Sequence, residues 1–201
     1  MIAWINLFVL MFSSLLFVLF YNMSVSPAFF EDQWGERAYK ICGRLRLVAM
    51  AFMGLACADY IVFCFYPLPL EGVLPLHFPW ARGISVVIAV LIGIPALALM
   101  VRGMIDAGSE LAVPDRSHVM YQGIYKKIRH PQAAGEVFLF MVIALACHSP
   151  FLALYSLWWF PAFYLISLAE EKDLVLRYKE DYVRYRNEVG MFWPRKRKTG
   201  M

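Results

Sequence analysis

Long apolar runs alternate with short polar stretches along most of this chain. Residues 1 to 30 carry no charged side chain, and a membrane-spanning helix needs about 20 consecutive apolar residues. The predicted spans are approximately 2–21, 47–66, 83–101, 132–147 and 151–168. The pattern therefore predicts an all-α integral membrane protein with five transmembrane helices, built as a single membrane domain over residues 1–201.

Prolines mark several of the predicted boundaries. The fourth apolar run is short, so its helix is expected to begin near Pro131, because proline is tolerated in the first turn of a helix. Only His148, Ser149 and Pro150 join the fourth and fifth spans, which predicts an antiparallel hairpin. A proline inside each of two spans, Pro95 and Pro161, predicts a kink.

The basic residues fall on one side of the predicted membrane. Of the 19 Lys and Arg residues, all except Arg82 lie between spans one and two, between spans three and four, or after span five. Five spans place these three segments on the same side. The positive-inside rule then predicts a cytoplasmic C-terminus and an outside N-terminus. The basic run 195–198 fits either a contact with anionic lipid headgroups or a solvated tail.

Composition agrees with a membrane environment. Hydrophobic residues make up 61% of the 201 residues, whereas soluble domains contain about half. The first apolar run lacks the basic start of a signal peptide, which indicates a retained helix. The four cysteines, Cys42, Cys57, Cys64 and Cys147, form no CxxC pair and no metal-ligand spacing with histidine. We expect buried apolar cysteines, with no disulfide framework and no metal site.

Two polar stretches, 102–136 and 170–194, flank the predicted hairpin on its cytoplasmic side. The first offers hydrogen-bond donors on Tyr125, Arg129 and His130. The second offers acceptors on two adjacent glutamates directly after the fifth span. The fold can therefore bring donors and acceptors together. Arg, Lys and Tyr at membrane boundaries also serve as interfacial anchors, and this alternative applies to the first stretch taken alone.

The second stretch has the periodicity of an amphipathic helix. Its apolar stripe recurs at steps of three and four residues and consists of Leu174, Tyr178, Tyr182, Tyr185 and Val189. Stepping back along this stripe places Glu170 and Glu171 at its edge, where they face the protein. Buried charge is costly without a partner, so the pattern predicts a C-terminal amphipathic cytoplasmic helix whose glutamates are paired.

These two stretches resemble a known family. "GIYKKIRHPQAAG" resembles the G-x-Y-x-x-x-R-H-P-x-Y-x-G motif of the isoprenylcysteine carboxyl methyltransferase and phospholipid methyltransferase superfamily of integral membrane enzymes. "EEKDLVLRYKEDYVRYRNEVGMFWP" resembles the E-E-x-x-L…G-x-x-Y-x-x-Y…P ending of these proteins. The resemblance covers about residues 110–194. It implies an S-adenosylmethionine site formed by the last two spans, the preceding loop and the C-terminal helix.

The resemblance also implies which residues carry the chemistry. The expected cofactor-binding residues are Ser117, His118, Val119, Met120, Tyr125, Arg129, His130, Pro131, Gln132, Ala133, Glu170 and Glu171. The reaction would be an in-line methyl transfer that depends mainly on alignment in a water-poor pocket. If the acceptor is an amine or a thiol, Glu136 and His118 are the candidates to take its proton.

Three departures from the family pattern bear on the acceptor and the fold. Ala133 replaces a tyrosine, and Lys179 replaces the glycine of the final motif, which we treat as the lesser change. Protein-prenyl enzymes carry a substrate-binding arginine before the glutamate pair, where this chain has Ile166 and Ser167. This argues against a prenylcysteine carboxylate. Expected partners are membrane lipids and an apolar or lipid-like acceptor, such as a lipid amine, a thiol or an isoprenoid-type carboxylate, and no nucleic acid.

Two other classes of function remain open from the sequence. Membrane sterol and steroid reductases that use NAD(P)H also carry an R-H-P-x-x-x-G-E string, which residues 129–136 fit. The paired glutamates and the tyrosine-rich ending favour the methyltransferases. A membrane protein without enzymatic activity, a scaffold or a transporter subunit, is the third alternative. Asp59 lies inside the second span, where an acid suggests function by default, although a structural acid bonded to a neighbouring helix is favoured here.

Overall fold

Helices make up most of the part of the chain that the structure describes, as the pattern predicts. The computed structural model describes residues 1–70, 72–108 and 122–195. Its helices are α1 (Ile2–Ser24), α2 (Pro27–Trp34), α3 (Arg37–Phe65), α4 (Arg82–Ala107), the 3₁₀ helix η2 (Gly123–Lys126), α5 (Pro131–Ala146), α6 (Pro150–Ser156) and α7 (Trp159–Glu188). Within these residues no strand forms, and one isolated bridge pairs Ile128 with Gly190.

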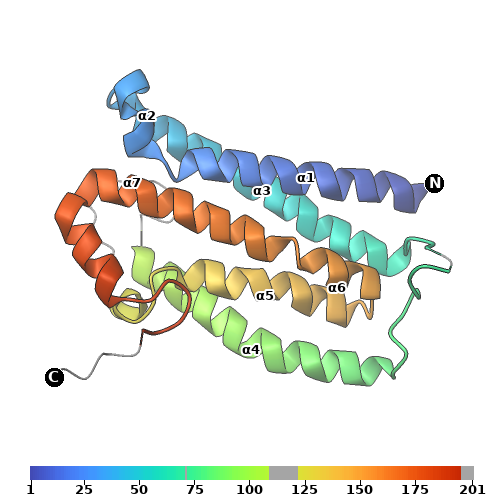
Figure 1. Cartoon of the computed structure of the whole chain (residues 1–201). Coiled ribbons are helices and arrows are strands. Elements are labelled where there is room, and N and C mark those ends of the chain that lie inside the picture. Colours follow the sequence, from blue (N-terminus) through green and yellow to red (C-terminus); the bar gives the residue numbers. More distant parts are fainter. Residues whose placement is uncertain (71, 109–121, 196–201) are drawn as a thin grey trace.

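The helices form two antiparallel pairs with α7 between them (Figure 1). In one pair α1 lies along α3, in the other α4 lies along α5, and α7 contacts both α1 and α5. The N-terminus and the α5–α6 turn lie at one end of the bundle. The opposite end, which we call the motif end, consists of α2, η2 and the last turns of α7 (Figure 1). The two sequence motifs are therefore at the same end of the bundle.

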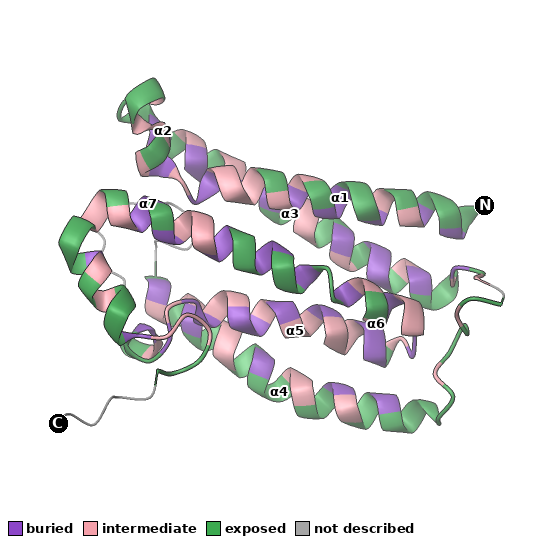
Figure 2. Cartoon of the chain, in the orientation of Figure 1, coloured by how far each residue is buried: buried purple, intermediate pink, exposed green. Residues whose placement is uncertain are grey.

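Most of the apolar helices are long enough to cross a bilayer. By length and composition, α1, α3, α4 and the segment Pro150–Glu188 are candidate membrane spans. The remaining apolar helix, α5, has 16 residues and is about 24 Å long, shorter than the roughly 30 Å hydrocarbon core. Large apolar side chains on the outer faces of α1, α3 and α4 are exposed (Figure 2). These faces suit contact with lipid.

Three boundaries differ from those that the hydropathy pattern predicts. The helix α3 begins at Arg37, ten residues before the expected span, and α2 forms in what was expected to be a loop. The expected fifth span is divided into α6 and α7, so Pro161 lies in the first turn of α7 and does not kink a continuous helix. A first-turn proline loses no helical hydrogen bond, which explains why the chain restarts a helix there. Pro95 does lie inside α4.

The predicted C-terminal amphipathic helix is not a separate element. It is the continuation of α7, which passes through Glu170 and Glu171 and changes direction at Lys179, a residue with φ 49° and ψ −127°. The apolar stripe still faces the protein, since Leu174, Tyr182 and Val189 are buried. The glutamates are therefore held by the same helix that packs between the two helix pairs.

Aromatic side chains fill the core where α7 meets its neighbours. Trp159 of α7 stacks on Phe140 of α5, with ring centroids 3.9 Å apart. The indole N–H of Trp159 donates to the hydroxyl of Tyr60 at 3.1 Å, and that hydroxyl also bonds Ser156 at 3.2 Å. The polar atoms of these three side chains are thus paired, as a low-polarity interior requires.

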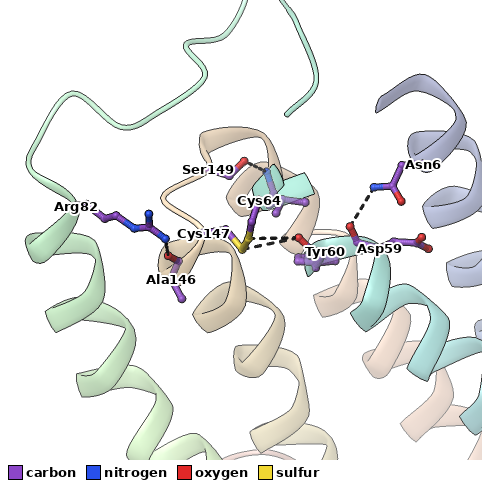
Figure 3. The surroundings of a disulfide bond; sticks show 9 residues. Asn6, Asp59, Tyr60, Cys64, Arg82, Ala146, Cys147 and Ser149 are labelled. Carbon is purple, nitrogen blue, oxygen red and sulfur yellow. Dashed lines mark hydrogen bonds between the residues drawn. A yellow bond between two sulfur atoms is a disulfide. The ribbon is translucent and has the colours of Figure 1, made fainter. Parts of the chain in front are cut away.

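The expectation of no disulfide is wrong. Cys64, near the end of α3, is bonded to Cys147, which follows α5, and their Cα atoms are 5.2 Å apart (Figure 3). The two residues are 83 positions apart in the sequence, and nothing in their local pattern pairs them. They meet because α3 packs beside α5 at the end opposite the motif end. Cys42 and Cys57 are free thiols.

Asp59 lies near this disulfide on α3 and contacts the neighbouring helix α1 (Figure 3). Its carboxylate accepts a hydrogen bond from the hydroxyl of Ser13 at 3.4 Å, and its backbone carbonyl accepts one from the side chain of Asn6 at 3.0 Å. These contacts agree with the structural interpretation of this acid.

Candidate functional site

The first motif begins with a turn that only glycine can form. Gly123 has φ +56°, and a Cβ atom built there would collide with the carboxylate of Asp106. That carboxylate accepts hydrogen bonds from the backbone N–H of Ile124 at 2.7 Å and from Arg102 at 2.9 Å. The turn delivers Tyr125 into the protein, where its hydroxyl donates to a carbonyl of α4 at 3.2 Å.

A second glycine of the motif sets the distance between α4 and α5. A Cβ atom at Gly135 would collide with the carbonyl of Ala96 and the backbone of Met100. A glycine at this position therefore allows the two helix backbones to come into contact. The close approach places the start of α5, with Pro131 in its first turn, against the end of α4.

Arg129 joins the first motif to the C-terminal segment. Its Nε atom donates to Glu171 at 2.7 Å, and its Nη1 atom donates to the carbonyls of Arg186 and Val189. The backbone N–H of Arg129 also donates to the carbonyl of Gly190 at 2.9 Å. We call this set of contacts the tail clasp. The sequence predicts that Arg129 binds the cofactor. In the structure, its Nε and Nη1 atoms form hydrogen bonds within the protein.

His130 bridges the two adjacent glutamates of the second motif. Its Nε2 atom lies 3.1 Å from Glu171 and its Nδ1 atom lies 3.4 Å from Glu170. Carboxylate oxygens only accept hydrogen bonds, so the imidazolium, with an N–H on each nitrogen, satisfies both. Burial by itself lowers the pKa of His130, but the hydrogen bonds and negative charges of the two glutamates outweigh it and raise this pKa above its ordinary value. The expected meeting of positions 130 and 170 is confirmed.

A small cavity opens beside this cluster between α1, α3, α5 and α7. Its volume is about 70 Å³, and it is lined by charged and polar side chains together with apolar ones. We call it the polar cavity. The expected site residues that line it are Tyr125, Arg129, His130, Gln132, Ala133, Glu136 and Glu170. Pro131 and Glu171 are not among its lining residues. Pro131 lies in the first turn of α5, and Glu171 bonds the lining residue His130.

Glu136 faces the polar cavity one turn after Gln132 on α5. The amide of Gln132 donates to its carboxylate at 3.0 Å. The remaining expected residues, Ser117, His118, Val119 and Met120, lie outside the described residues.

The sequence did not single out every residue that borders the polar cavity. Arg46 of α3, and Ser167 and Arg177 of α7, line it as well. In sequence, Arg46 is one more basic residue at the edge of an apolar run, and Ser167 is one small residue in a span. Only the packing of α3 against α7 brings them to this site.

Asp173 is another residue that sequence reasoning missed. It lies one turn beyond Glu170 on α7, is 2% exposed, and accepts hydrogen bonds from the backbone N–H groups of Ala28 at 2.7 Å and Phe29 at 3.0 Å. These two amides belong to the first turn of α2, where N–H groups lack helical partners. Asp173 therefore caps α2 from another helix and fixes one wall of the motif end.

A larger apolar groove lies on the other side of Ala133. Its volume is about 500 Å³, and α4, α5, α7 and the aromatic residues Phe192 and Trp193 form its walls. We call it the apolar groove. Two residues, Ala133 and Phe163, line both this groove and the polar cavity. A charged compartment and an apolar compartment therefore share a wall.

The comparison with known families agrees with this geometry. Residues 84–181, just under half of the chain, match the family model described as phospholipid methyltransferase. The superfamily resemblance is thereby confirmed. No curated protein and no solved structure matches the chain. The phospholipid methyltransferase match begins in α4 and ends in α7, so it spans the first motif and the paired glutamates but excludes α1 to α3.

The phospholipid methyltransferase match and the apolar helices together indicate an integral membrane methyltransferase. The comparisons give no support to the alternative of a reductase.

Proposed function

We propose that this protein transfers a methyl group from S-adenosylmethionine to a membrane-associated or apolar acceptor. The observation that carries the proposal is the contact between His130 and Glu170. These residues come from two motifs that are 40 positions apart, and both side chains border one polar cavity. Neither an interfacial anchor nor a solvated helix end requires such a contact.

The lining residues fit the functional groups of this cofactor. S-adenosylmethionine carries an ammonium, a carboxylate, a ribose and a methyl group activated on sulfonium. Glu136 and Glu170 supply acceptors in the polar cavity, and Gln132 supplies an N–H donor. The Tyr125 hydroxyl, whose proton bonds the carbonyl of Gly103, can accept a hydrogen bond there. A cavity of about 70 Å³ is smaller than the roughly 300–1,000 Å³ of typical ligand sites. It therefore suits one polar end of the cofactor, and the nucleoside requires the cavity to widen.

The apolar groove supports an acceptor with a hydrocarbon part. Its walls are the lipid-side residues of α4 and α7, so an acyl or isoprenoid chain can enter it from the bilayer. Ala133 stands between the groove and the polar cavity at the position where the family pattern has tyrosine. A short side chain there lets the acceptor come close to the cofactor. A lipid amine, a thiol or an isoprenoid-type carboxylate could each be presented in this way.

The residues of the chain contribute alignment and, for some acceptors, proton removal. The tail clasp and the bonds of His130 hold the two motifs in fixed positions, and fixed positions favour in-line transfer. Phe163 and Leu174 help to exclude water from the polar cavity. If the acceptor is an amine or a thiol, the carboxylate of Glu136, which lines the polar cavity, would take its proton.

We further propose that the motif end faces the cytoplasm and that the N-terminus lies outside. The distribution of basic residues supports this orientation. The disulfide at the opposite end agrees with it, because disulfides persist in oxidising compartments.

Ligand binding in detergent tests the proposal. S-adenosylhomocysteine should raise the unfolding temperature of the purified protein, and NADPH should not, because Glu136 and Glu170 can pair with the ammonium of an amino-acid group, which NADPH lacks. Glu170→Gln and His130→Ala should each weaken S-adenosylhomocysteine binding about tenfold or more, since each removes a charge-assisted contact. Native membranes incubated with methyl-labelled donor should then carry the label in their lipid fraction.

Glu180→Gln is the matched control, because Glu180 lies on the same helix and is exposed. It should bind S-adenosylhomocysteine as the wild type does. Stabilisation by NADPH and not by S-adenosylhomocysteine would overturn the methyltransferase proposal in favour of a reductase.

A further inference from the structure

A buried arginine from outside the family match borders the polar cavity. Arg46 of α3 is 8% exposed, and its guanidinium lies 5.9 Å from the ring centre of Tyr21. One of its Nη atoms donates to the carbonyl of Ser24 at 3.3 Å. These contacts with the C-terminal end of α1 fix a permanent positive charge at the wall of the cavity.

A hydroxyl group faces the same compartment without a partner. Ser167 of α7 lines the polar cavity, is 1% exposed, and its Oγ atom has no hydrogen-bond partner within the part of the chain that the structure describes. Buried hydroxyl groups are normally bonded, and an exception calls for an explanation. A bound acceptor group would provide one.

The charges around the polar cavity are arranged for a ligand that carries both signs. The acidic lining residues are Glu136 and Glu170, and the basic ones are Arg46, Arg129, His130 and Arg177. The cations Arg129 and His130 already bond Glu171, and Arg177 packs against the rings of Tyr39 and Tyr178. A ligand that carries only a negative charge would be repelled by the two glutamates. A ligand with an ammonium beside its carboxylate would not be repelled, because the ammonium can pair with them.

We propose that Arg46 and Ser167 bind the carboxylate of the methionine part of S-adenosylmethionine. This inference rests on the proposed function and assigns the cofactor carboxylate to residues that no motif contains. The ammonium of the same amino-acid group then faces Glu170 and Glu136. The volume of about 70 Å³ agrees with this assignment, because it suits an amino-acid group and not a nucleoside. The N-terminal half of the chain, outside the family match, thus completes the cofactor site.

Two ligands that differ in this amino-acid group test the assignment. S-adenosylhomocysteine carries the carboxylate, and 5′-methylthioadenosine lacks the whole amino-acid group. The dissociation constants of both are measured by calorimetry in detergent for the wild type, Arg46→Gln, Arg46→Lys and Ser167→Ala. Arg46→Gln should weaken the binding of S-adenosylhomocysteine about tenfold or more and leave the affinity for 5′-methylthioadenosine unchanged. Ser167→Ala should give a smaller loss with the same selectivity, and Arg46→Lys should restore part of the affinity.

Arg44→Gln is the control, since Arg44 is exposed on the same helix and lies outside the cavity. Equal weakening of both ligands by Arg46→Gln would show a general structural effect and overturn the assignment. Unchanged affinity for S-adenosylhomocysteine would overturn it as well, including the case in which Arg46 binds the phosphate of a lipid. If the wild type binds neither ligand, the proposed function itself fails, and that result is distinct from a loss of selectivity.

Discussion

Lys179 occupies a backbone conformation that L-amino acids rarely adopt. Its φ of 49° and ψ of −127° fall where glycine is the usual residue, and other residues held in such regions carry about 1–3 kcal/mol of strain. The family pattern has glycine at this position, which the sequence analysis treated as a lesser departure. The structure explains why glycine is favoured at this position. The helix α7 changes direction there, and this change brings Tyr185 into contact with the first motif. The Tyr185 hydroxyl donates to the carbonyl of Tyr125 at 2.6 Å.

Lys179→Gly should therefore stabilise the protein by about 1 kcal/mol, since relief of strain exceeds the added entropy of the unfolded chain. Thermal unfolding in detergent measures the effect. Lys172→Gly is the control, because Lys172 is exposed within the regular part of α7, where glycine costs about 1 kcal/mol. A lower unfolding temperature for Lys179→Gly than for the wild type would contradict this account.

At the scale of elements, α2 illustrates a helix that depends on a distant side chain. It has eight residues, and helices this short are not stable alone. Its N-cap residue, Ser26, makes no side-chain capping bond. Asp173 of α7 replaces the missing cap. The position of α2 is therefore coupled to the helix that carries the paired glutamates.

Asp173→Ala should destabilise the protein by about 1–2 kcal/mol, because two first-turn N–H groups lose their acceptor. Asp173→Asn should destabilise the protein less, since its side-chain oxygen can still accept hydrogen bonds from these N–H groups. Unfolding temperature and the rate of limited proteolysis between α1 and α3 are the measurements. Asp181→Ala, at an exposed position of the same helix, should have little effect. Equal proteolysis of Asp173→Ala and the wild type would argue that α2 is held by other contacts.

At the scale of the whole molecule, the two ends of the bundle are held by different chemistry. Ionic and backbone hydrogen bonds join the motif end, where Arg129, His130 and the paired glutamates meet. The Cys64–Cys147 disulfide joins the opposite end, where α3 meets the turn after α5. The covalent link connects the N-terminal half of the chain to the part that matches the family.

Removing the disulfide should lower the free energy of unfolding by about 4.5 kcal/mol, the chain-entropy value for a loop of 83 residues. The double variant Cys64→Ser/Cys147→Ser should unfold at a lower temperature than the wild type. Of these two proteins, only the wild type should unfold at a lower temperature when a reductant is added. Cys57→Ser is the control. Under denaturing conditions, two thiols should react with maleimide before reduction and four after it. Four reactive thiols without reductant would contradict the bond.

The sequence alone determined the helical membrane fold, the positions of the apolar helices, the hairpin turn and the two motifs with their paired glutamates. These features are local, because hydropathy, helical period and short motifs are properties of neighbouring residues. Tertiary structure alone decided that Cys64 meets Cys147, that Asp173 caps α2, and that Arg46 and Ser167 border one cavity with Glu170. Such contacts join residues far apart in the chain, and only the packing of α3, α5 and α7 against one another brings them within bonding distance.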